Sequence, residues 1–143
     1  MAYLFDTDAI SEVLRRRPAL AYLQWLKTVP RADQFTSTVV IGELYKGAFR
    51  SPHKAMHLEN IETRVLPALT VLPFDLDVSR IYGEIRAKLE TQGQMLADAD
   101  LQIAATAIFH DLEFVTGNLR HFERVPGLKI AAVFADARKR SRG

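Results

Sequence analysis

The chain has 143 residues, of which 48% are hydrophobic and 25% charged, as in an ordinary globular domain and unlike a disordered chain. It contains no cysteine, which excludes disulfides, thiolate zinc sites and a cysteine nucleophile. Four of the 19 basic residues lie in residues 137–143, so the formal net charge of +2 leaves 15 basic against 17 acidic residues, a net of −2, in residues 1–136. That charge does not indicate a basic nucleic-acid-binding domain, and without a signal-type segment or a membrane-length apolar run we expect a cytoplasmic protein.

Short apolar runs alternate with longer segments of helical periodicity along the chain. In chain order, the pattern predicts a strand at 2–5, helices at 9–16 and 18–28, a strand at 34–38, helices at 39–49 and 53–66, a strand at 69–74, helices at 76–91 and 100–110, a strand at 114–116, a helix at 119–125 and a strand at 128–134. Strands joined through helices predict an α/β fold with a mostly parallel five-stranded sheet and helices on both faces. We expect one domain over residues 1–136, followed by a basic, flexible tail over residues 137–143.

Acidic and amide side chains occur where a parallel sheet would bring them to one edge. Asp6 follows the first predicted strand and Glu43 lies in the helix after the second. Asp100 begins the helix before the fourth strand, and Asn118 follows that strand. Carboxylates gathered in this way repel one another unless a cation is present, and Mg²⁺ or Mn²⁺ takes oxygen ligands of this kind. The sequence therefore predicts one or two divalent ions that assist the hydrolysis of a phosphate ester.

Some of these acids have a second interpretation. Asp8 stands directly before a predicted helix and is expected to be its N-cap. Asp98 and Asp100 compete for the metal, and we favour Asp100 as the main ligand. Glu43 lies among apolar residues, where a buried carboxylate needs a partner, although a solvated Glu43 paired with a nearby lysine would also be satisfied.

Five segments resemble PIN-domain ribonucleases, in particular the VapC-type toxins of prokaryotic toxin–antitoxin pairs. In family order they are LFDTDAISE (4–12), TSTVVIGELYKGA (36–48), VLPFD (71–75), DADLQIAATA (98–107) and VTGNLRHFERVPGLKI (115–130). Together they span nearly the whole chain and imply a PIN-like fold. The resemblance also implies RNA as the substrate, a homodimer, and a cognate antitoxin that wraps the toxin and blocks its site.

The resemblance also assigns roles to individual residues. The family's acids fall on Asp6, Glu43 and Asp100, its fourth polar position falls on Asn118, and two hydroxyl residues that help to hold the site fall on Thr7 and Thr116. The chain departs from the family at Gly117, where an arginine is usual, and this change would remove a contact with substrate or inhibitor. It departs again at residues 131–143, where members normally stop soon after the last strand, so the resemblance assigns this end no role.

The resulting hypothesis is a metal-dependent endoribonuclease. Asp6, Asp100 and Glu43 are expected to bind one or two Mg²⁺ or Mn²⁺ ions, while Asn118 and Asp98 bind or orient as well. Glu43 is the candidate for orienting or deprotonating the attacking water, and cleavage would leave a 5′-phosphate and a 3′-hydroxyl. The candidate contacts to the RNA backbone are Lys46, Arg86, Lys88 and Arg120.

Two alternatives stay open at this point. The motif Asp6-Thr7-Asp8 also matches the opening of haloacid-dehalogenase-like phosphatases, in which Asp6 would be a covalent nucleophile. However, the chain is short for that family and has no convincing later lysine with paired acids. The other alternative is a PIN-like binding module without catalysis, which the retention of three acids argues against.

Overall fold

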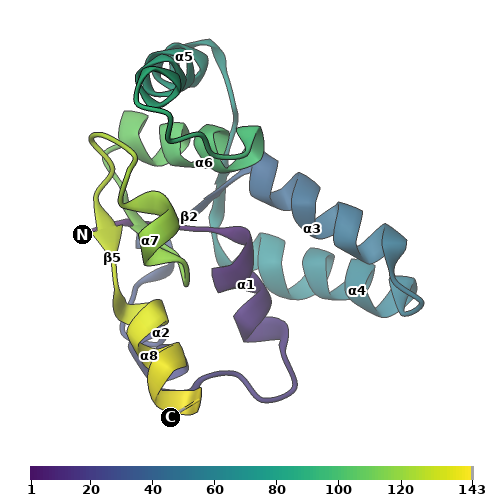
Figure 1. The fold of residues 1–143 in the computed structure, drawn as a ribbon. Helices are drawn as coiled ribbons and strands as arrows, with labels where there is room; N and C mark the ends of the chain where they lie inside the picture. Colours follow the sequence, from purple (N-terminus) through teal and green to yellow (C-terminus); the bar gives the residue numbers. More distant parts are fainter. Residues whose placement is uncertain (143) are drawn as a thin grey trace.

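Five short strands lie side by side in the order β3-β2-β1-β4-β5, and every neighbouring pair is parallel. The computed structural model describes residues 1–142 (Figure 1). The strands are β1 (Tyr3–Phe5), β2 (Gln34–Ser37), β3 (Thr70–Leu72), β4 (Glu113–Val115) and β5 (Ile130–Ala131). The α/β class and the parallel five-stranded sheet predicted from the sequence are confirmed.

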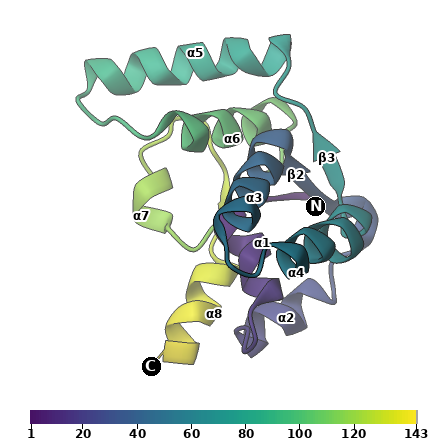
Figure 2. The ribbon, with the colours of Figure 1, turned by 90° about the vertical axis from the view of Figure 1, so that its right-hand side faces the viewer.

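Eight α-helices connect and follow the strands in the described residues. They are α1 (Thr7–Leu14), α2 (Leu20–Leu26), α3 (Thr38–Arg50), α4 (Lys54–Asn60), α5 (Leu76–Thr91), α6 (Asp98–Phe109), α7 (Leu119–Phe122) and α8 (Val133–Arg142). Figures 1 and 2 both show α5 and α6 stacked on one side of the sheet and α2 and α8 on the other, which confirms helices on both faces. None of the helices in this part of the chain is long and apolar enough to cross a membrane.

The central strand, β1, marks the point where the connections change direction. From β1 the chain passes outward to β2 and β3, then crosses back to β4 and β5 on the other side. Phe5 pairs with Val115 across the two strands, and the Asp6 N–H donates to the Val115 carbonyl at 3.1 Å. In open α/β sheets such a switch point forms a crevice at the carboxyl ends of the strands. Asp6 and Thr116 therefore emerge side by side at the position where this fold places its chemistry.

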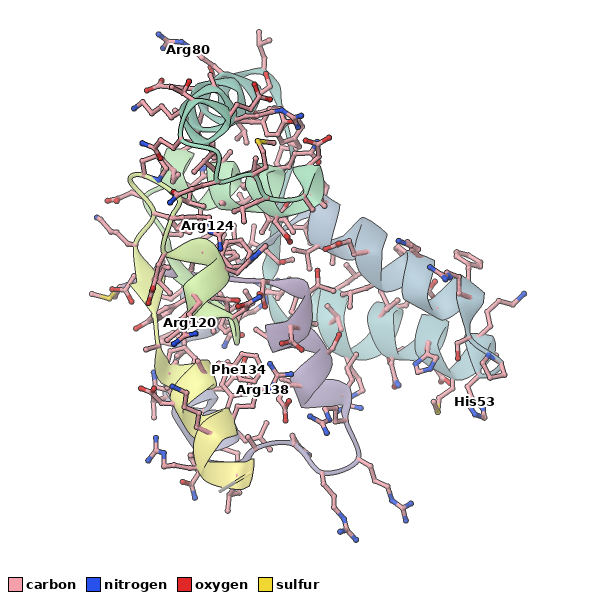
Figure 3. All side chains as sticks on the ribbon, viewed as in Figure 1. His53, Arg80, Arg120, Arg124, Phe134 and Arg138 are labelled. Atoms are coloured by element: carbon pink, nitrogen blue, oxygen red, sulfur yellow. The ribbon has the colours of Figure 1, made fainter. Side chains whose placement is uncertain are left out.

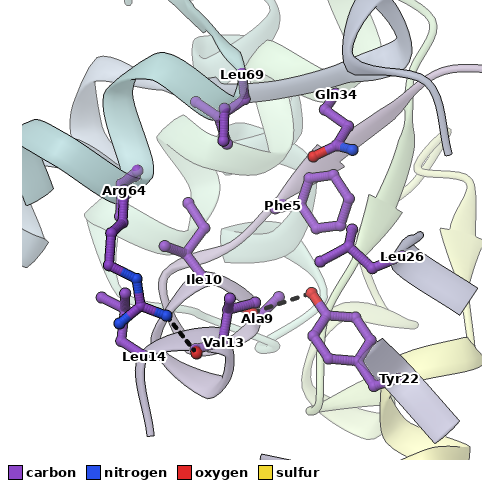
Figure 4. Close-up of a pocket in the computed structure, with 12 residues that line it drawn as sticks. Phe5, Ala9, Ile10, Val13, Leu14, Tyr22, Leu26, Gln34, Arg64 and Leu69 are labelled. Atoms are coloured by element: carbon purple, nitrogen blue, oxygen red, sulfur yellow. Dashed lines mark hydrogen bonds between the residues drawn. The ribbon is translucent and has the colours of Figure 1, made fainter. Parts of the chain in front are cut away.

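The first two helices are tied to each other and to the core beneath the site. The Tyr22 hydroxyl, fully buried on α2, donates to the Ala9 carbonyl on α1 at 3.0 Å. An apolar cavity of about 100 Å³ lies alongside this contact, lined by residues that include Phe5, Ile10 and Leu26 (Figure 4). The bond holds α1, and the acids at its start, against the rest of the domain.

The C-terminal segment differs from its prediction. The strand expected over 128–134 ends at Ala131, and α8 begins at Val133 and continues through the residues expected to form a flexible tail. Phe134 and Ala137, three residues apart on one helix face, are buried, and the Phe134 ring packs on Tyr22 of α2 with 4.6 Å between centroids. This short apolar stripe gives the basic segment a packed face, which its overall polarity concealed. Gly143 lies outside the described residues.

Candidate functional site

Asp6 is the buried acid at the centre of the site. It is 8% exposed at the end of β1, and its side chain caps α1 by accepting from the Ala9 N–H at 2.7 Å. The predicted cap, Asp8, instead lies in the first turn of α1, so that assignment was wrong. Burial raises the pKa of Asp6 to about 7, the hydrogen bonds from Thr116 and Ala9 oppose the rise, and the carboxylates of Asp8 and Asp100 add to it. The buried surroundings of Asp6 therefore disfavour the charged form of its own carboxyl group.

Glu43 approaches from α3 and is held by Thr7. The Thr7 hydroxyl donates to Glu43 Oε1 at 2.5 Å, joining residues 36 positions apart. Ser37 starts α3 by accepting from the Val39 N–H with its side chain, which fixes the helix directly after β2. The structure thus places Thr7 and Glu43 together, although Glu43 is only half-buried.

Asp100 lies in the first turn of α6 and contacts a histidine that the sequence analysis did not select. The His121 Nε2 atom is 2.9 Å from Asp100 Oδ2, and both side chains are about 30% exposed (29% and 31%). Asn118 caps α7 by accepting from the His121 N–H at 3.4 Å, and its own N–H donates to the Thr116 hydroxyl at 3.1 Å. In this arrangement Asn118 positions His121, while its side chain serves a helix cap.

Asp98 faces a different element from the other acids. Its carboxylate accepts from the Tyr82 hydroxyl at 2.7 Å and forms an ion pair with Arg86, both on α5. Arg86 also bonds Glu90 at 2.9 Å, and its pKa is raised by that hydrogen bond. Asp98 therefore helps to dock α6 on α5, an interaction that spacing along the sequence could not separate from metal binding.

The remaining cationic candidates are distributed over the surface. Lys88, on α5, lies 3.7 Å from Glu84, an exposed pair of little energetic value. Lys46 on α3 and Arg120 on α7 are exposed. A groove of about 1170 Å³ opens beside Thr7 and Glu43, and its lining includes the basic and polar residues Arg15, Arg16, His53, His57 and Arg64.

The chemistry of these acids fits a hard divalent cation. Across residues 1–142, no three His, Asp or Glu side chains converge into a preformed metal cluster. Asp6, Glu43 and Asp100 nevertheless supply carboxylate oxygens from three elements, and the raised pKa of Asp6 shows a carboxylate that a nearby cation would stabilise in its charged form.

One further charged side chain reaches this edge of the sheet from the end of the chain. Arg138 on α8 donates to both oxygens of Asp8 and lies against Phe134 (Figure 3). From the sequence, Arg138 was counted only as part of a basic tail. The apolar residues at 133–135 and 137, directly before the basic run at 138–140, were the available signal for a packed helix.

The comparisons with known proteins agree with one another. A model of the PIN domain matches residues 3–128. The VapC ribonuclease Y4jK of Sinorhizobium fredii is 35% identical over 84% of this chain and 89% of its own length. Toxin FitB of Neisseria gonorrhoeae is 36% identical over 83% of this chain and 89% of its own. The crystal structure of VapBC2 from Rickettsia felis, bound to a DNA fragment from their promoter, superposes with a TM-score of 0.85 at 27% identity, covering 92% of this chain and 98% of that one.

Proposed function

Because this chain belongs to the PIN domain family, we propose that it is a metal-dependent endoribonuclease that acts as the toxin of a toxin–antitoxin pair. The observation that carries the proposal is the meeting of three acid-bearing elements at the switch point of the sheet, in a chain similar to a VapC ribonuclease over most of its length. Membership of this family removes the support for the phosphatase alternative.

Asp6, Asp100 and Glu43 are the residues that would hold one or two Mg²⁺ or Mn²⁺ ions, which when bound would activate water and neutralise charge on the scissile phosphate. Thr116 and the start of α1 fix the orientation of the Asp6 carboxylate. Thr7 fixes Glu43, which leaves Glu43 Oε2 to orient or accept a proton from the attacking water. His121 contacts Asp100 through its Nε2 atom.

The groove beside Glu43 offers a path for the RNA backbone. Arginine and histidine side chains line it at one side of the site, and Lys46 and Arg120 add exposed positive charge on α3 and α7. Single-stranded RNA is held largely through its phosphates and by stacking of its bases. Arg86 and Lys88 are engaged with acids on α5 or α6, so we place them outside this path.

The proposed toxin would work with partners. A cognate antitoxin would bind over the site and block RNA access, and the toxin would form a homodimer. The structural similarity to VapBC2 supports the assignment to a toxin–antitoxin pair. With RNA as the substrate, we place this activity in the cytoplasm.

Cleavage of RNA by the purified protein is the direct test. The wild-type chain is expected to cleave with Mg²⁺ or Mn²⁺ and to stop in EDTA. Asp6→Asn and Asp100→Asn should each lower the rate at least about 100-fold, because each removes a negatively charged ligand. Gel analysis of end-labelled RNA, with 5′-phosphate detection, measures both rate and product ends. Absence of cleavage in pure wild type would support the binding-module alternative instead, and cleavage at the wild-type rate in both variants would overturn the assignment of Asp6 and Asp100 as metal ligands.

Asp98→Asn provides a matched control from the same helical turn as Asp100. Because the Asp98 carboxylate contacts Tyr82 and Arg86 on α5, its replacement is expected to leave the cleavage rate within about threefold of wild type. The exposed ion pair contributes at most about 1 kcal/mol to stability. A loss in Asp98→Asn comparable with that in Asp100→Asn would place Asp98 among the metal ligands after all.

A further inference from the structure

Gly117 leaves room at the site for a side chain from α8. A Cβ atom at residue 117 would overlap the Arg138 guanidinium, and it would lie 3.0 Å from Asp8 Oδ2 and 3.1 Å from the Phe134 ring. The backbone of Gly117 is not in the left-handed region, so glycine is required here for space and not for its conformation. The loop after β4 is therefore shaped to accept Arg138.

Packing on both sides holds Arg138 in this position. Its Nη1 and Nη2 atoms donate to the two oxygens of Asp8, the second at 3.0 Å, and its guanidinium carbon lies 5.0 Å from the centre of the Phe134 ring. Phe134 is fully buried on Tyr22, which is bonded to α1. Two-point pairing with a carboxylate and stacking on an aromatic ring are properties of arginine that lysine does not reproduce.

Arg138 retains hydrogen-bonding capacity beyond its pair with Asp8. A guanidinium has five N–H donors, and Asp8 occupies two of them. Among residues 1–142, Arg138 Nε is one of two buried side-chain nitrogen or oxygen atoms without a hydrogen-bond partner, and 22% of the Arg138 side chain is exposed. Asp8 stands two positions from Asp6, and the positive charge on Arg138 offsets an acid that would otherwise repel a phosphate.

We propose that Arg138 is a substrate-positioning residue, delivered by α8 through the gap at Gly117, which neutralises Asp8 and contacts a backbone phosphate of the bound RNA. This inference rests on the proposed ribonuclease activity. It assigns the C-terminal helix a role in binding substrate. The phosphate would accept from the exposed part of the Arg138 guanidinium and lie beside the acids that perform the chemistry.

The test compares Arg138→Gln with Lys139→Gln, an exposed residue on the same helix with the same change in charge. Arg138→Gln should raise KM for RNA about tenfold and leave kcat within about threefold, because a phosphate contact binds substrate and transition state alike. The dependence of log(kcat/KM) on log salt should become shallower by about 0.7, the loss expected for one phosphate contact with a single strand. Lys139→Gln should change neither quantity by more than about twofold, and Arg138→Lys should fall between wild type and Arg138→Gln.

Assays are run well below the measured Tm of each variant, and Arg138→Lys replaces Arg138→Gln if the latter is unfolded at that temperature. If Arg138→Gln and Lys139→Gln had the same KM and salt slope, the role of Arg138 would be overturned. With wild type active and Asp6→Asn inactive, the proposed nuclease function would still stand. Inactive wild type would overturn the proposed function itself. Gly117→Ala tests the geometry independently. It should lower Tm more in wild type than in Arg138→Ala, where only the close contacts of the added Cβ with Asp8 and Phe134 remain. Equal effects in both backgrounds would contradict the close approach of Arg138.

Discussion

Asp6→Asn is expected to stabilise the metal-free protein at neutral pH while it abolishes cleavage. Burial raises the pKa of Asp6 from 3.8 to about 7, so at neutral pH its charged form is less favourable in the folded protein than in the unfolded chain, where it is solvated. A tenfold change in an ionisation constant corresponds to about 1.4 kcal/mol, which gives a gain of about 2 to 4 kcal/mol in the free energy of unfolding. Asparagine can still cap α1 by accepting from the Ala9 N–H.

The pH dependence of this effect has a defined sign. Because the pKa is higher in the folded state, the wild-type contribution is fully present below about pH 4 and is lost as the pH rises through about 7. Urea unfolding in EDTA can be measured at about pH 4.5, near the unfolded pKa of Asp6, and at about pH 8, above its folded pKa. The gain in the free energy of unfolding from Asp6→Asn should be larger at the higher pH. Mg²⁺ or Mn²⁺ should raise the Tm of wild type and not that of the variant. If Asp6→Asn were less stable than wild type at pH 8 in EDTA, the charged form of Asp6 would not be destabilising in the folded protein.

Glu12→Ala is expected to destabilise the fold by about 2 to 4 kcal/mol through a single contact. Glu12 is 3% exposed on α1, and its Oε2 accepts from the Ala19 N–H, which starts α2, at 2.8 Å. Truncation leaves this N–H buried without a partner, because Ala19 is itself 3% exposed. Glu12→Gln keeps an oxygen acceptor and should cost less, about 1 kcal/mol.

Two controls separate this contact from the surface charge of Glu12. Arg15 also bonds Glu12 at 3.1 Å, but its side chain is 54% exposed, so Arg15→Ala should cost less than about 0.5 kcal/mol. Glu84→Ala, at an exposed position of α5, should likewise have little effect. Urea denaturation with a shared m-value measures all four variants, and equal stabilities for Glu12→Ala and Glu84→Ala would rule out the role of the Ala19 contact.

The alternation of strands and helices could be predicted from the sequence, because each element reflects the conformational preferences of its own residues. Buried parallel strands are short apolar runs, and α5 spans Leu76–Thr91, as its helical periodicity predicted. The prediction was wrong at the C-terminus, where the local pattern of residues 128–134 continued as a strand and the structure forms α8 after Ala131. The difference arises because Phe134 packs on Tyr22, more than 100 residues earlier in the chain, and no local pattern records that contact.

For the acids at the site, too, the sequence predicted the positions along the chain but not the contacts. The sequence placed Asp6, Glu43 and Asp100 after or before the correct elements, because the ends of parallel strands follow from strand order alone. It could not assign Asp98 and Asp100 to different partners, since the two residues lie in one helical turn and only the packing of α5 on α6 directs Asp98 to Arg86.

By itself, the sequence determined the α/β class, the parallel sheet and the positions of the acids beside its strands and helices, since these follow from periodicity and chain order. Only the tertiary structure decided which side chain each acid contacts: Thr7 for Glu43, His121 for Asp100 and Arg86 for Asp98. It also decided that a basic end, counted from composition as a charged tail, brings Arg138 to Asp8, 130 residues away in sequence. Such contacts depend on the relative positions of packed helices, which are set by the whole core and not by any one segment.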